Sequence, residues 1–340
     1  MIILLIGLST LITIYAGGIK VFSGEITTGT IAEFIMYVNM LTWPVASIGW
    51  VTSIVQRAAA SQTRINEFLS YEPSVVNQTQ DATPIKGSLR FEKVSFVYPD
   101  SGIVAIKDIS FSVAAGQSVA IIGRTGSGKS TLAALITRQY DVSSGQIYID
   151  ETPLQKINLN SLRSAIGYVP QEVFLFSETI SNNIAFGFKP NHVASEKDQQ
   201  SIEQAAKDAA IYDSIIQFPE GFSTRVGERG VTLSGGQKQR ISIARAIIRK
   251  PEVLIFDDCL SAVDTATEEE VLTNLRRIMK GRTSVIIAHR ISTVKHCDQI
   301  IVLDHGSIVE QGTHQDLINK DGIYAELNRK QLLEEASAQF

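Results

Sequence analysis

Cysteine is scarce in this sequence, since only Cys259 and Cys297 occur among its 340 residues. Neither lies in a Cys-x-x-Cys pair or beside a histidine cluster, so neither a disulfide framework nor a zinc site is indicated. An excess of basic residues is also missing, because the formal net charge is -4 and the pI is about 5.8. Such a charge does not draw a protein to phosphate backbones, and we expect no nucleic acid partner.

Charged residues are absent from two long stretches near the N-terminus, Ile2 to Ile19 and Phe34 to Val55. As helices these stretches reach roughly 27 and 33 Å, against about 30 Å for the hydrocarbon core of a bilayer. We therefore predict two membrane spans, over about residues 2–22 and 31–55, joined as a hairpin. The alternatives are a signal peptide, for which Met1 to Ile3 provides no positive segment, and a pair of buried core helices.

Basic residues are unevenly distributed around these stretches. The connecting loop contains one, Lys20, whereas several follow the second stretch: Arg57, Arg64, Lys86, Arg90 and Lys93. Because basic residues favour the cytoplasmic side, we expect a multi-pass protein of the cell membrane, in contact with lipid, with its C-terminal portion in the cytoplasm.

The remainder of the chain has the composition of a folded α/β domain. We predict a membrane part over residues 1–72, a linker over 73–87, a soluble domain over 88–330 and a tail over 331–340. The domain begins with alternating apolar and polar residues, typical of half-exposed strands. Its later apolar runs are continuous and rich in β-branched residues, as in a parallel sheet covered on both faces.

A phosphate-binding loop is predicted directly after the apolar run Val119 to Ile122. The sequence Gly-Arg-Thr-Gly-Ser-Gly-Lys-Ser matches G-x-x-x-x-G-K-[ST] and opens a helical stretch. Glycines let backbone N–H groups converge on phosphate oxygens, while the lysine reaches the β- and γ-phosphates and the serine can hold Mg²⁺. The nucleotide-binding residues expected here are Gly123, Arg124, Thr125, Gly126, Ser127, Gly128, Lys129, Ser130 and Thr131.

A pair of carboxylates follows a second buried run, Val253 to Phe256. Ligands of open α/β sheets bind at the carboxyl ends of such strands. Asp257 is therefore predicted to hold Mg²⁺, and Asp258 to orient or deprotonate an attacking water molecule. An Asp-Asp pair of this kind can also serve as a turn or helix cap.

The pentapeptide Leu233-Ser234-Gly235-Gly236-Gln237 resembles the signature of the ABC transporter ATPases. Its serine can cap the helix that follows, and its glycines let the positive end of that helix approach a negative group. In the family, this group is the γ-phosphate of ATP bound to the partner subunit. The resemblance therefore implies that Ser234, Gly235, Gly236 and Gln237 contact ATP, and that the protein is an obligate homodimer or heterodimer with a related half-transporter.

Other short motifs resemble the family in the same order along the chain. Tyr98 resembles the aromatic residue that stacks on adenine, Gln171 the glutamine that senses Mg²⁺, Asp264 the D-loop aspartate and His289 the switch histidine. The segment 224–230 resembles one that contacts the membrane domain in exporters. The resemblance implies a P-loop NTPase domain with an antiparallel β subdomain and a helical subdomain, in which Gln171 and His289 assist catalysis and Gln171 also senses the metal.

The sequence departs from the family pattern at two places. Family members competent in fast hydrolysis usually carry Glu where this chain has Asp258. A carboxylate withdrawn by about an ångström can reduce the rate on the order of a hundredfold, so slow hydrolysis is expected. The second departure is the pair of spans, because a half-transporter of this type has six, and the resemblance implies further spans upstream.

These motifs together predict an exporter subunit that uses ATP and Mg²⁺ to move a drug, lipid or peptide across the membrane. Two alternatives remain open at this point. A soluble ABC ATPase acting on DNA or ribosomes would have no membrane spans. A regulatory subunit that binds ATP but scarcely hydrolyses it is favoured by Asp258 and opposed by His289.

Overall fold

The structure is a computed structural model that describes residues 2–188, 195–227, 232–259 and 265–337. The chain divides into two compact units, Met1–Pro73 and Ser74–Phe340. We describe each unit by itself.

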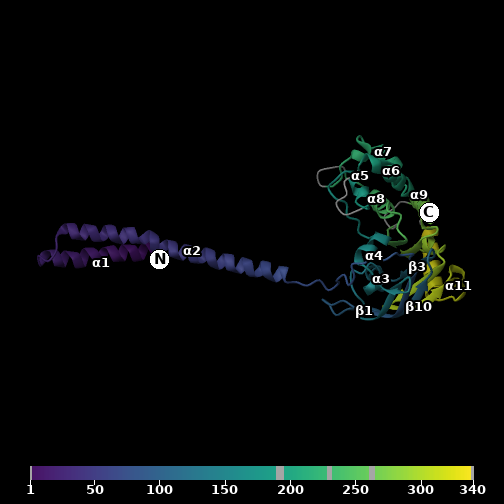
Figure 1. Cartoon of the computed structure of the whole chain (residues 1–340), viewed down its shortest axis with the longest axis horizontal. Helices are drawn as coiled ribbons and strands as arrows, with labels where there is room; N and C mark the ends of the chain where they lie inside the picture. Colours follow the sequence, from purple (N-terminus) through teal and green to yellow (C-terminus); the bar gives the residue numbers. More distant parts are fainter. Residues whose placement is uncertain (1, 189–194, 228–231, 260–264, 338–340) are drawn as a thin grey trace. The chain divides into compact units, whose positions relative to one another are not determined.

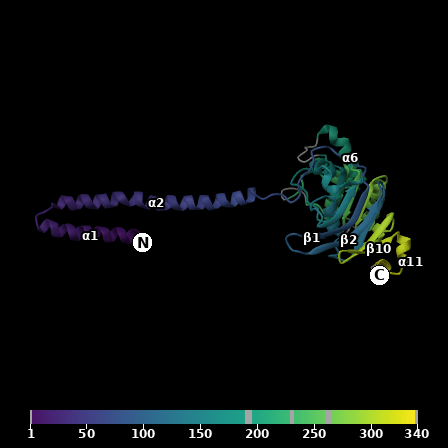
Figure 2. The same cartoon turned by 60° about the horizontal axis from the view of Figure 1, so that its bottom comes forward.

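The first unit is a hairpin of two helices, α1 (Ile2–Phe22) and α2 (Thr28–Leu69), which lie side by side in both views (Figures 1 and 2). Both are long and apolar enough to cross a membrane by length and composition, with mean hydropathies of 1.7 and 1.3 over an 18-residue window within Leu4–Phe22 and within Thr28–Leu69, respectively. The α2 helix extends well beyond the stretch predicted to span, through the more polar residues after Val55. It also contains Pro44, whose missing N–H removes one backbone hydrogen bond.

The second unit contains an antiparallel sheet in the order β2-β1-β4-β5. Its longest strands show alternating burial, since one face packs on the core and the other meets solvent. The strands are β1 (Leu89–Val97), β2 (Val104–Val113), β4 (Ser144–Ile149) and β5 (Thr152–Pro153).

A second sheet has the order β10-β9-β3-β8-β7-β6, with parallel neighbours except for the antiparallel pair of β9 and β10. Every residue of its strands β7 and β8 is buried, as their continuous apolar runs predict. The strands are β3 (Ser118–Gly123), β6 (Ile166–Val169), β7 (Val253–Asp257), β8 (Thr283–Ile287), β9 (Gln299–Asp304) and β10 (Ser307–Gly312). The predicted α/β class is confirmed.

Helices α5 to α8 gather beside one another in Figure 1, and α8 also contacts β6 of the six-stranded sheet. The α-helices of the unit are α3 (Lys129–Ile136), α4 (Leu159–Ala165), α5 (Ile180–Ala185), α6 (Gln199–Asp208), α7 (Tyr212–Ile216), α8 (Gly235–Ile247), α9 (Thr265–Met279), α10 (Ile291–Val294), α11 (His314–Asn319) and α12 (Ile323–Ser337). Short 3₁₀ turns cover Leu154–Lys156, Glu196–Asp198 and Gly221–Ser223.

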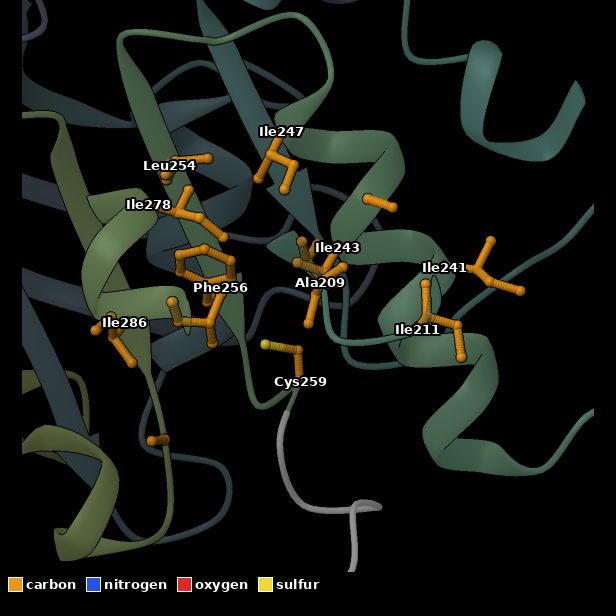
Figure 3. Packing of buried hydrophobic residues seen from close by; sticks show 14 of the residues in the cluster. Ala209, Ile211, Ile241, Ile243, Ile247, Leu254, Phe256, Cys259, Ile278 and Ile286 are labelled. Carbon is orange, nitrogen blue, oxygen red and sulfur yellow. The ribbon is translucent and has the colours of Figure 1, made fainter. Parts of the chain in front are cut away.

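The six-stranded sheet separates two hydrophobic clusters. Successive side chains of a strand point to opposite faces, so Val119 and Ile121 of β3 join one cluster, while Ala120 and Ile122 join the other. The first cluster also contains the inner face of the antiparallel sheet. The second packs β7 and β8 against α8 and α9, with Phe256 among its members (Figure 3). Burial on both faces thus fixes the strands whose ends carry the predicted site.

Candidate functional site

Three neighbouring parallel strands, β3, β7 and β8, end at the same edge of the six-stranded sheet. The loop after β3 leads to Lys129, β7 ends at Asp257, and His289 lies two residues after the end of β8. Strand order therefore gathers at one edge groups that lie far apart in the sequence. Such an edge is the usual ligand-binding position in open α/β sheets.

The loop between β3 and α3 requires glycine at two positions. A Cβ atom on Gly123 would lie 2.1 Å from the carbonyl oxygen of Leu303, and one on Gly128 would lie 2.5 Å from that of Ala105. Gly128 also has a φ of 101° and precedes α3 directly. The loop consequently turns tightly into the helix, whose first residue is Lys129.

The side chain of Lys129 folds back over this loop. Its Nζ donates hydrogen bonds to the carbonyl oxygens of Gly123 and Arg124, both at 2.9 Å. Burial lowers the pKa of this ammonium, and the negative charges of Asp258 and Asp257 oppose that shift. The loop thus holds a largely desolvated cation at the start of a helix, which is the electrostatic setting that a phosphate group needs.

Ser127 provides a second indication of an anionic ligand. Its side chain is 3% exposed, and its hydroxyl group has no hydrogen-bond partner among the described residues. Leaving a buried hydroxyl unpaired costs free energy, which an oxygen atom of a bound phosphate would offset. The loop residues therefore fit a phosphorylated ligand.

Asp257, the last residue of β7, is 3% exposed. Its carboxylate accepts hydrogen bonds from Ser130 Oγ at 3.1 Å and Tyr168 OH at 3.4 Å. Burial raises the pKa of Asp257, and these two hydrogen bonds partly oppose the rise. Burial and the adjacent carboxylate raise the pKa of Tyr168 to about 12, so its phenol remains a donor at neutral pH.

The described ranges contain no group of three or more His, Cys, Asp or Glu side chains arranged to hold a metal ion. Mg²⁺ is commonly bound through one or two carboxylates, with water and substrate phosphates completing its six ligands. The buried carboxylate of Asp257 beside the hydroxyl of Ser130 fits this mode of Mg²⁺ coordination. The same pair does not fit a closed structural metal site.

Asp258 lies directly after β7 with a φ of 45°, and its N–H donates to the carbonyl oxygen of Ile287 in β8 at 2.8 Å. Its carboxylate accepts a hydrogen bond from Gln171 Nε2 at 3.4 Å. Asp258 and His289 also line the same pocket, which has a volume of about 100 Å³. The structure thus brings the three side chains predicted to be catalytic to one region.

Tyr98 lies near the start of α3, where its hydroxyl group and that of Thr131 are 3.0 Å apart. Its ring meets those of Phe96 and Tyr140 edge-on, with ring centroids 5.0 and 5.6 Å apart. The aromatic residue predicted to contact adenine therefore belongs to the surroundings of the phosphate loop.

Ser234 is the N-cap of α8. Its hydroxyl accepts a hydrogen bond from the N–H of Gln237 at 3.2 Å, while the Gln237 side chain accepts from the N–H of Ser234 at 3.0 Å. In the described part of the chain these bonds join Ser234 to its own helix, and not to the phosphate loop. Asp264, the remaining predicted contact, lies outside the described residues.

Two contacts of the site do not follow from sequence motifs. Tyr168 reaches Asp257 because β6 pairs with β7, and Gln331 of α12 contacts the backbone at His289. Neither residue type identifies such a role. The only local signal for Tyr168 is its position one residue before the end of β6, three residues before Gln171.

Comparison with known proteins agrees with this geometry. Residues 106–261 match the family model described as ABC transporter. The chain is 45% identical over 331 residues to the probable multidrug resistance ABC transporter ATP-binding/permease protein YheI of Bacillus subtilis (strain 168), covering 97% of this chain and 56% of that protein. It is also 44% identical over 305 residues to the ATP-dependent lipid A-core flippase of Pseudomonas fluorescens (strain Pf0-1), and this match covers 90% of this chain and 50% of that protein.

A solved structure of a bacterial Atm1-family ABC exporter with ATP bound superimposes with a TM-score of 0.77 and 39% identity, covering 91% of this chain and 53% of that one. The chain thus spans about half the length of the relatives that it matches. Its matched region contains the phosphate loop, the signature and the aspartate pair. The second unit of this chain therefore belongs to the ABC transporter family, as its ATP-binding domain.

Proposed function

We propose that this chain is the ATP-hydrolysing subunit of a membrane exporter, and that it uses the energy of hydrolysis to move a substrate out of the cell. The observation that carries the proposal is the hydrogen bond of 3.1 Å between Ser130 of the phosphate loop and Asp257 at the end of β7. The names of the relatives favour a drug or a lipid as substrate, and a peptide remains a third class. The long apolar helices α1 and α2 support a multi-pass protein with its ATP-binding domain in the cytoplasm.

The phosphates of ATP are proposed to lie against the loop from Gly123 to Thr131, where Lys129 supplies positive charge and Ser127 a buried hydroxyl group without a partner among the described residues. Ser130, Asp257 and Gln171 are proposed to hold Mg²⁺. When bound, Mg²⁺ would neutralise charge on the phosphate oxygens as the terminal bond breaks. The raised pKa of Asp257 supports this assignment, because a buried carboxylate gains most from a cation.

Asp258 is proposed to orient the attacking water molecule, with the assistance of Gln171, which contacts it, and of His289, which lines the same pocket. The hydrogen bond from Gln171 holds the Asp258 carboxylate, and the backbone bond to Ile287 fixes its position relative to β8. Because Asp is one methylene shorter than Glu, we propose that this site hydrolyses ATP slowly.

Among the described residues, the printed hydrogen bonds of Ser234 join it to its own helix and not to the phosphate loop. We propose that a second subunit, identical or related, contacts the far side of the γ-phosphate through its own Ser234, Gly235, Gly236 and Gln237, with the D-loop residue Asp264 nearby. The cap on α8 supports this role, because the positive end of a helix favours a phosphate group. Tyr98 is proposed to stack on the adenine ring.

A groove beside the loop after Gln171 supports coupling to membrane spans other than α1 and α2. It has a volume of about 350 Å³ and is lined by Val173, Phe174, Leu175, Val226, Gly227, Thr232, Leu233 and Lys238. Phe174 is 67% exposed there although it is a large apolar residue. We propose that a cytoplasmic loop of the membrane domain occupies this groove.

The direct test is Mg²⁺-dependent ATP turnover by the purified protein in lipid nanodiscs. We expect turnover that falls at least about a hundredfold in Lys129→Ala, because the buried cation at the phosphates is lost. Asp258→Glu is expected to raise turnover by up to about a hundredfold, since the longer side chain restores the reach to water. An unchanged rate in Asp258→Glu would contradict the proposed cause of slow hydrolysis.

A second function, that of a regulatory subunit that binds ATP without hydrolysing it, is favoured by the same Asp258. It predicts binding of ATP that depends on Lys129 but no turnover by this chain alone. Turnover would then appear only with a related subunit that has Glu at the corresponding position. The two measurements, binding and turnover, separate the two functions.

A further inference from the structure

The first turn of the C-terminal helix α12 is firmly held by the rest of the second unit. The carboxylate of Glu310 in β10 accepts hydrogen bonds from the N–H of Ile323 at 2.6 Å and from that of Tyr324 at 3.1 Å. Tyr324 is fully buried, and its hydroxyl group is 2.7 Å from Nδ1 of His314. The start and direction of α12 are therefore set by contacts far from the strand edge that carries the site.

Residues three and seven positions after Tyr324 lie on the same face of α12. Leu327 packs on the hydrophobic cluster that contains Tyr324. Gln331 follows one turn further along this face, and it is half-buried, while the preceding Lys330 is exposed. The buried face of α12 thus directs the Gln331 side chain toward α10.

The amide group of Gln331 spans the turn between β8 and α10. Its Nε2 donates to the carbonyl oxygen of His289 at 2.5 Å, and its Oε1 accepts from the N–H of Ile291 at 2.7 Å. Ile291 is the first residue of α10, and the N-cap residue Arg290 makes no side-chain capping bond. Gln331 therefore satisfies an N–H group that the start of a helix leaves unpaired.

This pair of bonds requires an amide. A carboxylate of the same length could accept from Ile291 but could not donate to His289, and an aliphatic side chain could do neither. The two bonds connect residues 42 and 40 positions apart in the sequence. They fix the backbone on both sides of Arg290 with a single side chain.

We infer that Gln331 is a positioning residue that holds the turn carrying His289. This inference rests on the proposed function in one respect, namely the role of His289 in catalysis beside Asp258. On the other side of His289, the N–H of Ala288 bonds to the carbonyl oxygen of Ile121 at 3.3 Å. His289 itself is exposed, so its orientation depends on how firmly these flanking groups hold its backbone.

The decisive variant is Gln331→Met, which keeps the length of the side chain and the helix but removes both hydrogen bonds. Lys330→Met introduces the same residue at the neighbouring exposed position and serves as the matched control. In the nucleotide-free protein in nanodiscs, we expect the amide of Ile291 to exchange with deuterium roughly tenfold faster in Gln331→Met, and at the wild-type rate in the control. Equal exchange in the two variants would overturn the inference.

Gln331→Glu separates the two bonds, because it keeps the acceptor for Ile291 and loses the donor to His289. We expect exchange at Ile291 close to wild type in this variant. We also expect kcat for ATP to fall by about fivefold to tenfold in both Gln331→Glu and Gln331→Met, with little change in KM. A lower thermal midpoint with unaltered kcat would indicate a merely structural role and contradict the inference.

Failure of the proposed function would be recognised separately. Wild-type turnover that did not depend on Lys129 would contradict the proposed ATP site, and an unchanged kcat in His289→Ala would contradict the role of His289. The exchange rate at Ile291 would still decide whether Gln331 holds the turn, because that measurement needs no nucleotide.

Discussion

At the scale of single residues, two buried or half-buried aspartates lie in opposite environments. Burial raises the pKa of Asp257, and its two hydroxyl donors do not fully compensate. Burial also acts on Asp150, but the backbone N–H groups of Lys86, Gly87 and Ser88 donate to its carboxylate at 2.5 to 3.1 Å. These bonds outweigh burial and lower the pKa of Asp150.

Asp257→Asn is therefore expected to raise the thermal midpoint of the nucleotide-free protein at pH 7, by roughly 2–4 °C. A raised pKa means that the ionised carboxylate destabilises the folded state above that pKa. This penalty disappears as the pH falls through the pKa of Asp257 in the folded state toward its usual pKa of 3.8. The difference in thermal midpoint between the variant and the wild type should therefore shrink on acidification. Thermal unfolding measured as a function of pH tests this, and loss of stability at pH 7 would contradict it.

Asp150→Asn is the matched control with the opposite sign. Because the pKa of Asp150 is lowered in the folded state, its ionised carboxylate stabilises that state at any pH above its usual pKa of 3.8. This stabilisation is lost as the pH falls through the lower pKa of the folded state. The variant should therefore be less stable than wild type at pH 7. The thermal midpoints of Asp150→Asn and wild type, measured as a function of pH, should converge at acidic pH.

At the scale of elements, the segment that follows the first unit is bound along the surface of the second. Arg138 Nη2 donates to the carbonyl oxygen of Val76 at 3.2 Å, Asn158 Nδ2 to that of Thr79 at 2.8 Å, and the N–H of Thr83 to Ser161 Oγ at 3.1 Å. Arg138 lies two residues after α3, the helix that begins at Lys129. The segment is thus attached to the element that carries the phosphate loop.

Arg138→Met is expected to lower the free energy of unfolding by about 2–3 kcal/mol. The side chain of Arg138 is fully buried, and it also donates to Asp141 and to the carbonyl oxygen of Gln155, so its loss leaves several acceptors unpaired. Urea denaturation gives the magnitude, and limited proteolysis should show faster cleavage within residues 74–87.

Arg277→Met is the control for this prediction. Arg277 pairs with Asp208 at 2.7 Å, but its side chain is 63% exposed. An exposed ion pair contributes little, and we expect a change within about 0.5 kcal/mol. Equal losses in the two variants would show that burial at Arg138 is not the cause.

At the scale of the whole molecule, the proposed binding of ATP between two subunits predicts that two inactive chains complement one another. Lys129→Ala removes the phosphate contact of its own chain, and Ser234→Arg blocks the signature that it offers to a partner. A dimer of one Lys129→Ala chain and one Ser234→Arg chain retains one intact site. Lys129 of the second chain and Ser234 of the first chain form that site. Co-expression should therefore restore ATP turnover to about half that of wild type or less.

The control combines both substitutions in one chain and co-expresses it with wild type. Each site of that mixed dimer then carries one defect, so the mixed dimer, separated from the wild-type dimers through different affinity tags on the two chains, should have no turnover. Turnover of this isolated dimer equal to that of the isolated complementing dimer would contradict a site shared between two copies of this chain.

The sequence by itself determined the local features of this protein. Charge-free runs predicted long helices at α1 and α2, continuous β-branched runs predicted β3, β7 and β8, and the spacing of glycines and Lys129 predicted the phosphate loop. These features follow from interactions within a few residues along the chain, namely backbone conformation, periodicity and capping. The family signature at Ser234 is local in the same sense.

Only the tertiary structure decided which of these groups meet. Ser130 contacts Asp257 across 127 residues of sequence, Tyr168 reaches the same carboxylate, and Gln331 holds the backbone of His289. Such contacts depend on strand order and on the direction in which a buried helix face points. The hydrophobic effect that selects the core is non-directional, so residue types alone do not specify which strands become neighbours or which polar groups pair at their ends.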